Sequence, residues 1–334
     1  MGRRSRRSKR KLNSLFMALL LTGMLLLSST YAWFSANKEV ELNGINAKVV
    51  AAEGLQISLD GESWSSKITL NKAALEGATA NNYVWPDALT PVSTVGAVDG
   101  GNMSMYYGDI TAEGDKLSNP SNETTGSTKY IVFDLYFKNS SSQAAGDTLQ
   151  LNVGSKVAIA TDGKTGTGLE NSIRSSVVLY ENSTIMTESG ENIRAIAAGT
   201  PKVCIWEPNA SKHIAEIVKN DDRITSAEQA YVTMGLKSIT PDGEGFIPGV
   251  NETTANDNID EQKTLATADT IGTATDMTNL GGTDKLTLKQ NSVMKARVYI
   301  WLEGQDPDCI DTASTGKSID MVLAFTKPAV NKEP

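Results

Sequence analysis

Histidine and cysteine are scarce in this 334-residue chain, which holds one histidine and two cysteines. The single His213 lies in SKHIAEIVKN, and Ile217 occupies the position where a zincin helix needs its second histidine. Cys204 and Cys309 are too far apart in the sequence for a C-x-x-C zinc or redox motif. The composition therefore excludes the zincin and C-x-x-C motifs.

Other catalytic signatures are also missing. The chain has no G-x-S-x-G elbow, no P-loop and no G-x-G-x-x-G sequence after a predicted strand. The glycine-rich stretch DGKTGTG, residues 162–168, lacks Walker spacing, and we interpret it as an exposed turn. A Ser-His-Asp triad needs only one histidine, so counting alone leaves that class open. We nevertheless interpret the chain as non-enzymatic.

Acidic residues are absent from residues 1–32, which carry seven basic residues. The basic stretch RRSRRSKRK precedes an apolar run, Leu15–Leu27, of about 13 residues, whereas a spanning helix needs about 20. The small residues of Thr30-Tyr31-Ala32 predict a signal peptide over residues 1–32, cleaved between Ala32 and Trp33. The alternative is an uncleaved anchor that extends through Phe34. Both interpretations place the rest of the chain outside the cell.

Negative charge dominates the exported part. The chain has 31 basic and 39 acidic residues, and without residues 1–32 the balance becomes 24 minus 39, or −15. Such a surface repels nucleic acid and anionic lipid. We therefore expect no nucleic-acid partner, and membrane contact only through an uncleaved N-terminal segment.

Period-two alternation of apolar residues is the main structural signal. It predicts strands over residues 38–42, 55–59, 130–138, 149–153, 175–180, 202–206, 293–302 and 319–325. We interpret the polar stretch NSSSQAAGD, residues 139–147, as a hairpin loop, and residues 81–105 as an irregular excursion. Helical patterns are short: residues 70–76 with Asn71 as cap, 213–219 and 226–236. The strands lack regular helices between them, which favours an all-β antiparallel β-sandwich.

We expect one β-sandwich domain over residues 33–334, with a polar acidic insertion at about 239–284. Two features of this domain have open alternatives. Cys204 and Cys309 would form either a disulfide, as exported chains allow, or two separate buried thiols. Asp306, Asp308 and Asp311 are either a calcium site or solvated loop carboxylates, and we expect no cofactor other than this calcium.

Several motifs together resemble the camelysin and TasA-like family of secreted bacterial surface proteins. They are TYAWFSANKEV at the leader junction, GLQISL, YIVFDLYFKNSSS followed by LQLNV, RVYIWLEGQDPDCID, and SIDMVLAFT near the end. They cover about a third of the chain. The resemblance implies a jelly-roll-like sandwich, export through a dedicated signal peptidase, and a role in surface or biofilm-matrix fibres.

In such fibres the N-terminal strand of one subunit completes the sheet of the next. The candidate donor is the segment 33–42, whose Trp33, Phe34, Val40 and Leu42 supply its apolar side chains. The alternative is that this segment forms the first strand of its own domain. The expected partners are further copies of the chain or other matrix proteins.

The leading hypothesis is thus a secreted structural protein that self-associates through strand edges. One alternative is a membrane-tethered extracellular module that binds a glycan or protein, with Trp64 or Trp85 as a stacking platform. Another is a camelysin-type metalloprotease, against which the missing metal motif counts.

Overall fold

The computed structural model describes residues 40–41, 45–51, 54–92, 94, 98–110, 117–123, 129–140, 147–151, 154–185, 188–196, 201–206, 208–209, 271–272, 287–303, 309, 313 and 318–327. The predicted helices 213–219 and 226–236 and nearly all of the insertion at 239–284 lie outside these residues.

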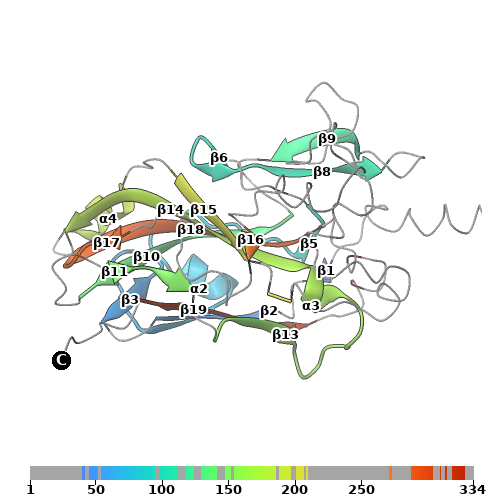
Figure 1. Ribbon diagram of the computed structural model, residues 1–334, viewed down its shortest axis with the longest axis horizontal. Helices are drawn as coiled ribbons and strands as arrows, with labels where there is room; N and C mark the ends of the chain where they lie inside the picture. Colours follow the sequence, from blue (N-terminus) through green and yellow to red (C-terminus); the bar gives the residue numbers. More distant parts are fainter. Residues whose placement is uncertain are drawn as a thin grey trace, which may run out of the picture.

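Two stacked sheets form the molecule, which confirms the predicted all-β sandwich (Figure 1). In spatial order the six-stranded sheet comprises β16 (Ile271–Gly272), β15 (Pro201–Trp206), β14 (Ile173–Ile185), β18 (Ser292–Leu302), β10 (Ile131–Asn139) and β3 (Leu55–Ser58). The five-stranded sheet comprises β12 (Gln150–Leu151), β19 (Ile319–Thr326), β2 (Ile45–Ala51) and β4 (Lys67–Leu70), with β13 (Lys156–Ile159) also beside β19.

Four two-stranded ladders and three short helices complete the described structure. The ladders are β1 (Val40–Glu41) with β5 (Ala88–Leu89), β6 (Val98–Asp99) with β7 (Asn102–Met103), β8 (Met105–Ile110) with β9 (Leu117–Glu123), and β11 (Asp147–Thr148) with β17 (Thr287–Leu288). The helices are α2 (Lys72–Glu76), α3 (Leu169–Ser172) and α4 (Gly190–Arg194).

The main core fills the space between the sheets. On β10 the alternating residues Ile131, Phe133, Leu135 and Phe137 are all 0% exposed and belong to this core, as the period-two pattern predicts. The short α2 lies between the sheets and buries Leu75 there. Its predicted cap is confirmed, because the side-chain oxygen of Asn71 accepts a hydrogen bond from the backbone N–H of Ala74 at 2.8 Å.

The predicted hairpin across residues 139–147 is wrong. β10 pairs with β18 and β3, whereas β12 pairs with β19 in the opposite sheet, so the polar loop crosses between the sheets. Leu149 and Leu151 still face the main core, but from the other side. The alternation was interpreted correctly; the error lay in assuming that consecutive strands are neighbours.

The excursion after α2 covers the outer face of the six-stranded sheet. On that face Tyr299 and Trp301 are 1% and 0% exposed. The backbone N–H of Met103 donates a hydrogen bond to the Tyr299 hydroxyl at 3.0 Å, and Val84 forms a β-bridge with Val132. The members of this second core are Val92, Met103, Met105, Tyr130, Val132, Val178, Tyr180, Ile205, Tyr299 and Trp301. The six-stranded sheet is therefore buried on both faces.

Candidate functional site

The first strand is held by a very short ladder. β1 pairs antiparallel with β5 through Val40 opposite Leu89 and Glu41 opposite Ala88, and no other described strand lies beside β1. At roughly 0.5–1.5 kcal/mol net for each hydrogen bond, such a ladder adds little stability. Of the predicted donor residues only Val40 is described. Ala32, Trp33, Phe34 and Leu42 lie outside the described residues, so cleavage and strand donation stay predictions.

Self-association through strand edges depends on which edges are open. The edge of β3 is closed, because Ile57 and Ser65 exchange backbone hydrogen bonds of 2.8 and 2.9 Å. On β4 the Ser65 hydroxyl accepts from the backbone N–H of Lys67 at 3.1 Å and donates to its carbonyl at 2.8 Å. Shortness, an exposed Lys67 and this side-chain cap are devices that discourage edge pairing.

The opposite edge of the five-stranded sheet is closed in a similar way. The side-chain amide of Asn209 donates to the carbonyl of Val157 on β13 at 3.2 Å and to the carbonyl of Glu170 at 2.7 Å. Between β12 and β13 the hydroxyl of Ser155 bonds both the N–H and the carbonyl of Ala324, at 3.0 and 3.2 Å. Side chains thus supply hydrogen bonds that a neighbouring strand would otherwise make.

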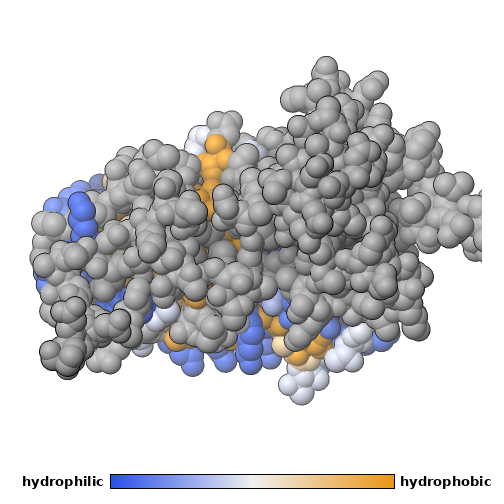
Figure 2. Space-filling model, in the orientation of Figure 1, coloured by the Kyte–Doolittle hydropathy of each residue, from blue (hydrophilic) through white to orange (hydrophobic). Residues whose placement is uncertain are grey.

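The remaining edge belongs to β15. Within the described part of the chain its outer side is paired only where β16 meets Ile205 and Trp206, in parallel. Residues 201–204 have no described strand on that side. The half-buried Val203 packs beside the second core, as does Val98 of β6. Figure 2 shows a band of apolar atoms in the upper middle of the view, where Figure 1 places β6 and β15. This is the candidate acceptor edge.

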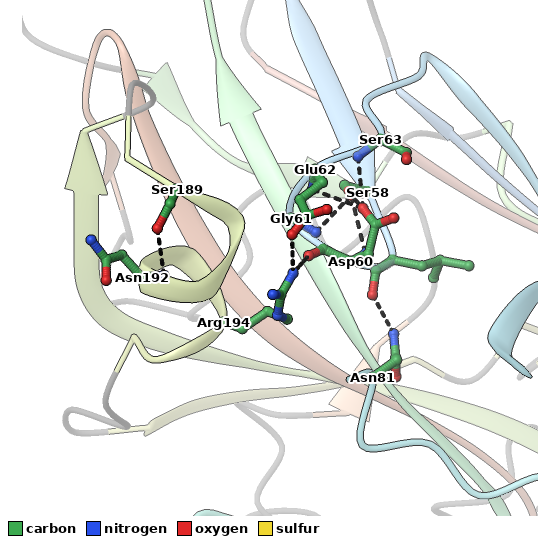
Figure 3. Close-up of polar contacts among 10 residues, drawn as sticks. Ser58, Asp60, Gly61, Glu62, Ser63, Asn81, Ser189, Asn192 and Arg194 are labelled. Carbon is green, nitrogen blue, oxygen red and sulfur yellow. Dashed lines mark hydrogen bonds and ion pairs between the residues drawn. The ribbon is translucent and has the colours of Figure 1, made fainter. Parts of the chain in front are cut away.

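A turn and α4 close one end of the sandwich (Figure 3). Arg194 of α4 donates to the carbonyl of Asp60 at 2.8 Å and to a carboxylate oxygen of Glu62 at 2.7 Å. Gly61, with φ of +73°, sits against α4, and a Cβ there would lie 2.8 Å from Cγ2 of Ile193. The turn therefore requires glycine both for its backbone conformation and for this close packing. We assign this contact a structural role.

Asp60 organises that turn. Its carboxylate accepts hydrogen bonds from the backbone N–H groups of Glu62 and Ser63 at 2.8 and 2.7 Å, and from the Ser58 hydroxyl at 2.8 Å. Burial by itself would raise the pKa of Asp60, but these hydrogen bonds outweigh it and lower the pKa below its usual 3.8. The folded protein thus favours the ionised form of Asp60.

The Asp60→Asn variant should lose about 1 kcal/mol of unfolding free energy at neutral pH. A carboxyl with a lowered folded-state pKa stabilises above its unfolded pKa, and that contribution disappears as the pH falls through the folded value. The difference between wild type and variant should therefore shrink as the pH is lowered below about 4. Urea unfolding at pH 7 and at pH 3 measures this, and an equal difference at both values would contradict the assignment.

A buried carboxylate on the outer sheet face was missed in the sequence. Asp134 of β10 is 0% exposed, and one of its oxygens lies 3.0 Å from Nζ of Lys295. The Arg297 guanidinium lies 3.9 Å from the other oxygen, and the side-chain amide of Asn82 donates to the first at 3.2 Å. An available signal was the acid within IVFDLYF and the bases within VMKARVY, the two strongest predicted strands.

The other predicted site residues are only partly described. Cys309 is buried in the main core, and Cys204 lies on β15 opposite Val177, but the Cys204 side chain is outside the described set, so the disulfide stays a prediction. Asp306, Asp308 and Asp311 are outside it as well. Among the described residues no group of three or more acidic, histidine or cysteine side chains could hold a metal ion. Nor is any described helix long and apolar enough to cross a membrane.

The two tryptophans proposed as sugar platforms are half-buried. Trp64 packs beside Tyr136 and Ile193, and Nζ of Lys138 lies 4.4 Å from its ring centre. Burial lowers the pKa of Lys138. Trp85 packs against the main core. Both side chains therefore already make internal contacts.

Comparison of the chain with protein-family models, with curated proteins and with solved structures finds no match.

Proposed function

We propose that this chain is a secreted structural protein of the bacterial cell surface or biofilm matrix, which polymerises when the segment 33–42 of one copy pairs with an open strand edge of the next. The physical basis is β-augmentation, in which an extended segment adds main-chain hydrogen bonds along an unpaired edge. In β-augmentation generally, pockets for alternate side chains of the added segment give specificity.

The observation that supports the proposal is the unequal treatment of the sheet edges. Side chains or a crossing strand close the edges of β3, β4 and β13, whereas the outer side of residues 201–204 on β15 has no described partner. Natural sheets usually protect their edges against pairing with other chains. An edge without a described partner is therefore a candidate for functional pairing with a second copy.

The donor side of the proposal rests on β1. Among the described residues of the segment Val40 and Glu41 are paired, and releasing these two positions from β5 costs about 1–3 kcal/mol of hydrogen bonding. A longer ladder on a neighbouring copy would more than replace it. Cleavage between Ala32 and Trp33 would free the segment, whereas an uncleaved leader would keep it at the membrane.

Negative-stain microscopy of the mature protein, residues 33–334, tests the proposal directly. We expect fibres from this form and dispersed particles from a form that begins at residue 43. A synthetic peptide of residues 33–42 added in excess should shorten the fibres, because it occupies acceptor edges without offering one. A peptide of the same composition in scrambled order is the matched control, and circular dichroism checks that the truncated form remains folded.

Two results would count against it. Equal fibres from both forms would show that the segment 33–42 is not the donor. Mature protein that stays dispersed at high concentration would rule out self-association. N-terminal sequencing of the secreted material settles the leader separately: Trp33 as the first residue demonstrates cleavage.

A further inference from the structure

One buried carboxylate oxygen contacts both the amine of a lysine and the side-chain amide of an asparagine, two groups that can form an amide bond together. Oδ2 of Asp134 is 3.0 Å from Nζ of Lys295 and accepts a hydrogen bond from Nδ2 of Asn82 at 3.2 Å. Asp134 is 0% exposed, and the Lys295 side chain is 13% exposed. The amine and the side-chain amide therefore contact the same buried carboxylate oxygen, at a place where Asn82 reaches the surface.

The backbone around Asn82 is held firmly over this carboxylate. The Arg297 guanidinium donates to the backbone carbonyl of Asn82 at 3.0 Å. The preceding Asn81 accepts a hydrogen bond from the backbone N–H of Asp134 at 3.0 Å and donates to its carbonyl at 2.8 Å. Positioning of this kind replaces an encounter in solution and can lower the barrier of a reaction substantially.

Hydrogen bonding in the cluster is also incomplete. Oδ1 of Asp134 and Nε of Arg297 are buried and make no hydrogen bond to any described residue, although they lie 3.9 Å apart. Buried charged groups in a purely structural pair normally satisfy each other closely.

We propose that Lys295 and Asn82 form an intramolecular isopeptide bond, with Asp134 as the proton carrier. Oδ2 of Asp134 takes a proton from the Lys295 ammonium, and the neutral amine attacks Cγ of Asn82. The new C–N bond forms as the C–Nδ2 bond breaks, and Asp134 returns its proton to the departing nitrogen. Asp134 then takes the second proton from the attacking nitrogen and passes it to the departing ammonia. One hydrogen of the original ammonium stays in the new amide, and two leave on the Asn82 nitrogen as an ammonium ion.

The reaction needs no oxidant and no cofactor, and Asp134 is a carboxylate both before and after it. The Arg297 guanidinium contacts the backbone carbonyl of Asn82 and so helps to fix the position of this residue. Asn82 is exposed at the surface, so the released ammonium ion has a path to solvent. The same oxygen contacts both nitrogens, so one proton carrier serves both halves of the reaction.

The bond would link β18 covalently to the start of the excursion after α2, which covers the outer face of the six-stranded sheet. A cross-link between positions so far apart in sequence restricts the unfolded chain strongly and would keep the cover in place under load. The inference stands independently of the proposed fibre assembly, because it concerns one chain alone.

Intact-mass measurement of the folded wild-type protein, followed by peptide mapping, tests it. We expect a mass lower than the sequence mass by one ammonia, and a branched peptide that joins the segments containing Asn82 and Lys295. Lys295→Arg and Asn82→Ala should each restore the sequence mass. Lys156→Arg, an exposed position on the opposite sheet, is the matched control and should keep the deficit.

The branched peptide decides the result, because Asn43-Gly44 can also lose ammonia by closing a succinimide ring. A folded wild-type protein with the full sequence mass would overturn the proposal. So would a deficit without the branched peptide, or a link from Lys295 to Asp134 with loss of one water. These readouts come from the wild-type protein, so they remain decisive if a variant fails to fold.

Discussion

The Phe137→Ala variant should lose about 3–5 kcal/mol of unfolding free energy, the usual cost of removing a fully buried aromatic ring. Phe137 of β10 is 0% exposed, and its ring centre lies 4.8 Å from that of Phe325 on β19 in an edge-to-face arrangement with an interplanar angle of 71°. The pair joins the two sheets directly, so the cavity would open at their interface. A loss of this size is a large fraction of the stability of a typical domain.

Urea unfolding followed by circular dichroism measures this effect. The matched control is Lys48→Ala on β2, whose side chain is exposed on the outer face of the five-stranded sheet and should change stability by about 0.5 kcal/mol or less. If the Phe137 variant lost less than about 1 kcal/mol, the two sheets would not pack through this pair.

The Asp134→Ala variant should be destabilised by about 3–5 kcal/mol for a different reason. Removing the carboxylate leaves the Lys295 and Arg297 side chains, which are only 13% and 19% exposed, without their buried counter-charge. Most of the cost is this uncompensated positive charge, since one partner of a buried ion pair is removed while the other stays in place. The same urea titration measures it.

Two further variants separate charge from packing. Asp320→Ala on β19 removes a half-buried carboxylate that accepts one hydrogen bond, at 2.9 Å from Asn46, and should cost about 1 kcal/mol or less. Replacing Asp134, Lys295 and Arg297 together by apolar residues of similar size should recover the part of the loss that comes from unpaired charge, but not stability supplied by a Lys295–Asn82 cross-link. If this triple variant were as unstable as Asp134→Ala, loss of packing would explain the effect.

Much of the fold was predictable because it depends on local patterns. The alternation in residues 131–137 identified a strand and the face that it buries, and Asn71 marked the start of a helix. Both signals act over a few residues, through side-chain direction in a strand and a side-chain oxygen at a helix end. The folded protein keeps this strand and this helix start because tertiary packing favours the same local conformations.

The candidate sites were less predictable. Residues Asn82, Asp134 and Lys295 come from three separate segments, and only the pairing of β10 with β18 and the bridge between Val84 and Val132 bring them together. The capping of β13 by Asn209 likewise has no local sequence signal, because its partner Val157 lies far away in the chain. That residues 201–204 of β15 have no described strand on their outer side follows from the strand order of the whole sheet.

By itself the sequence determined which segments are strands and which of their faces are apolar. Only the tertiary structure decided the partners: the parallel pairing of β2 with β19, the passage of the chain from β10 to the opposite sheet, and the covering of Tyr299 and Trp301 by the excursion. The physical reason is that alternation fixes the direction of a side chain relative to its own backbone. The choice of neighbour depends instead on burying all such faces at once.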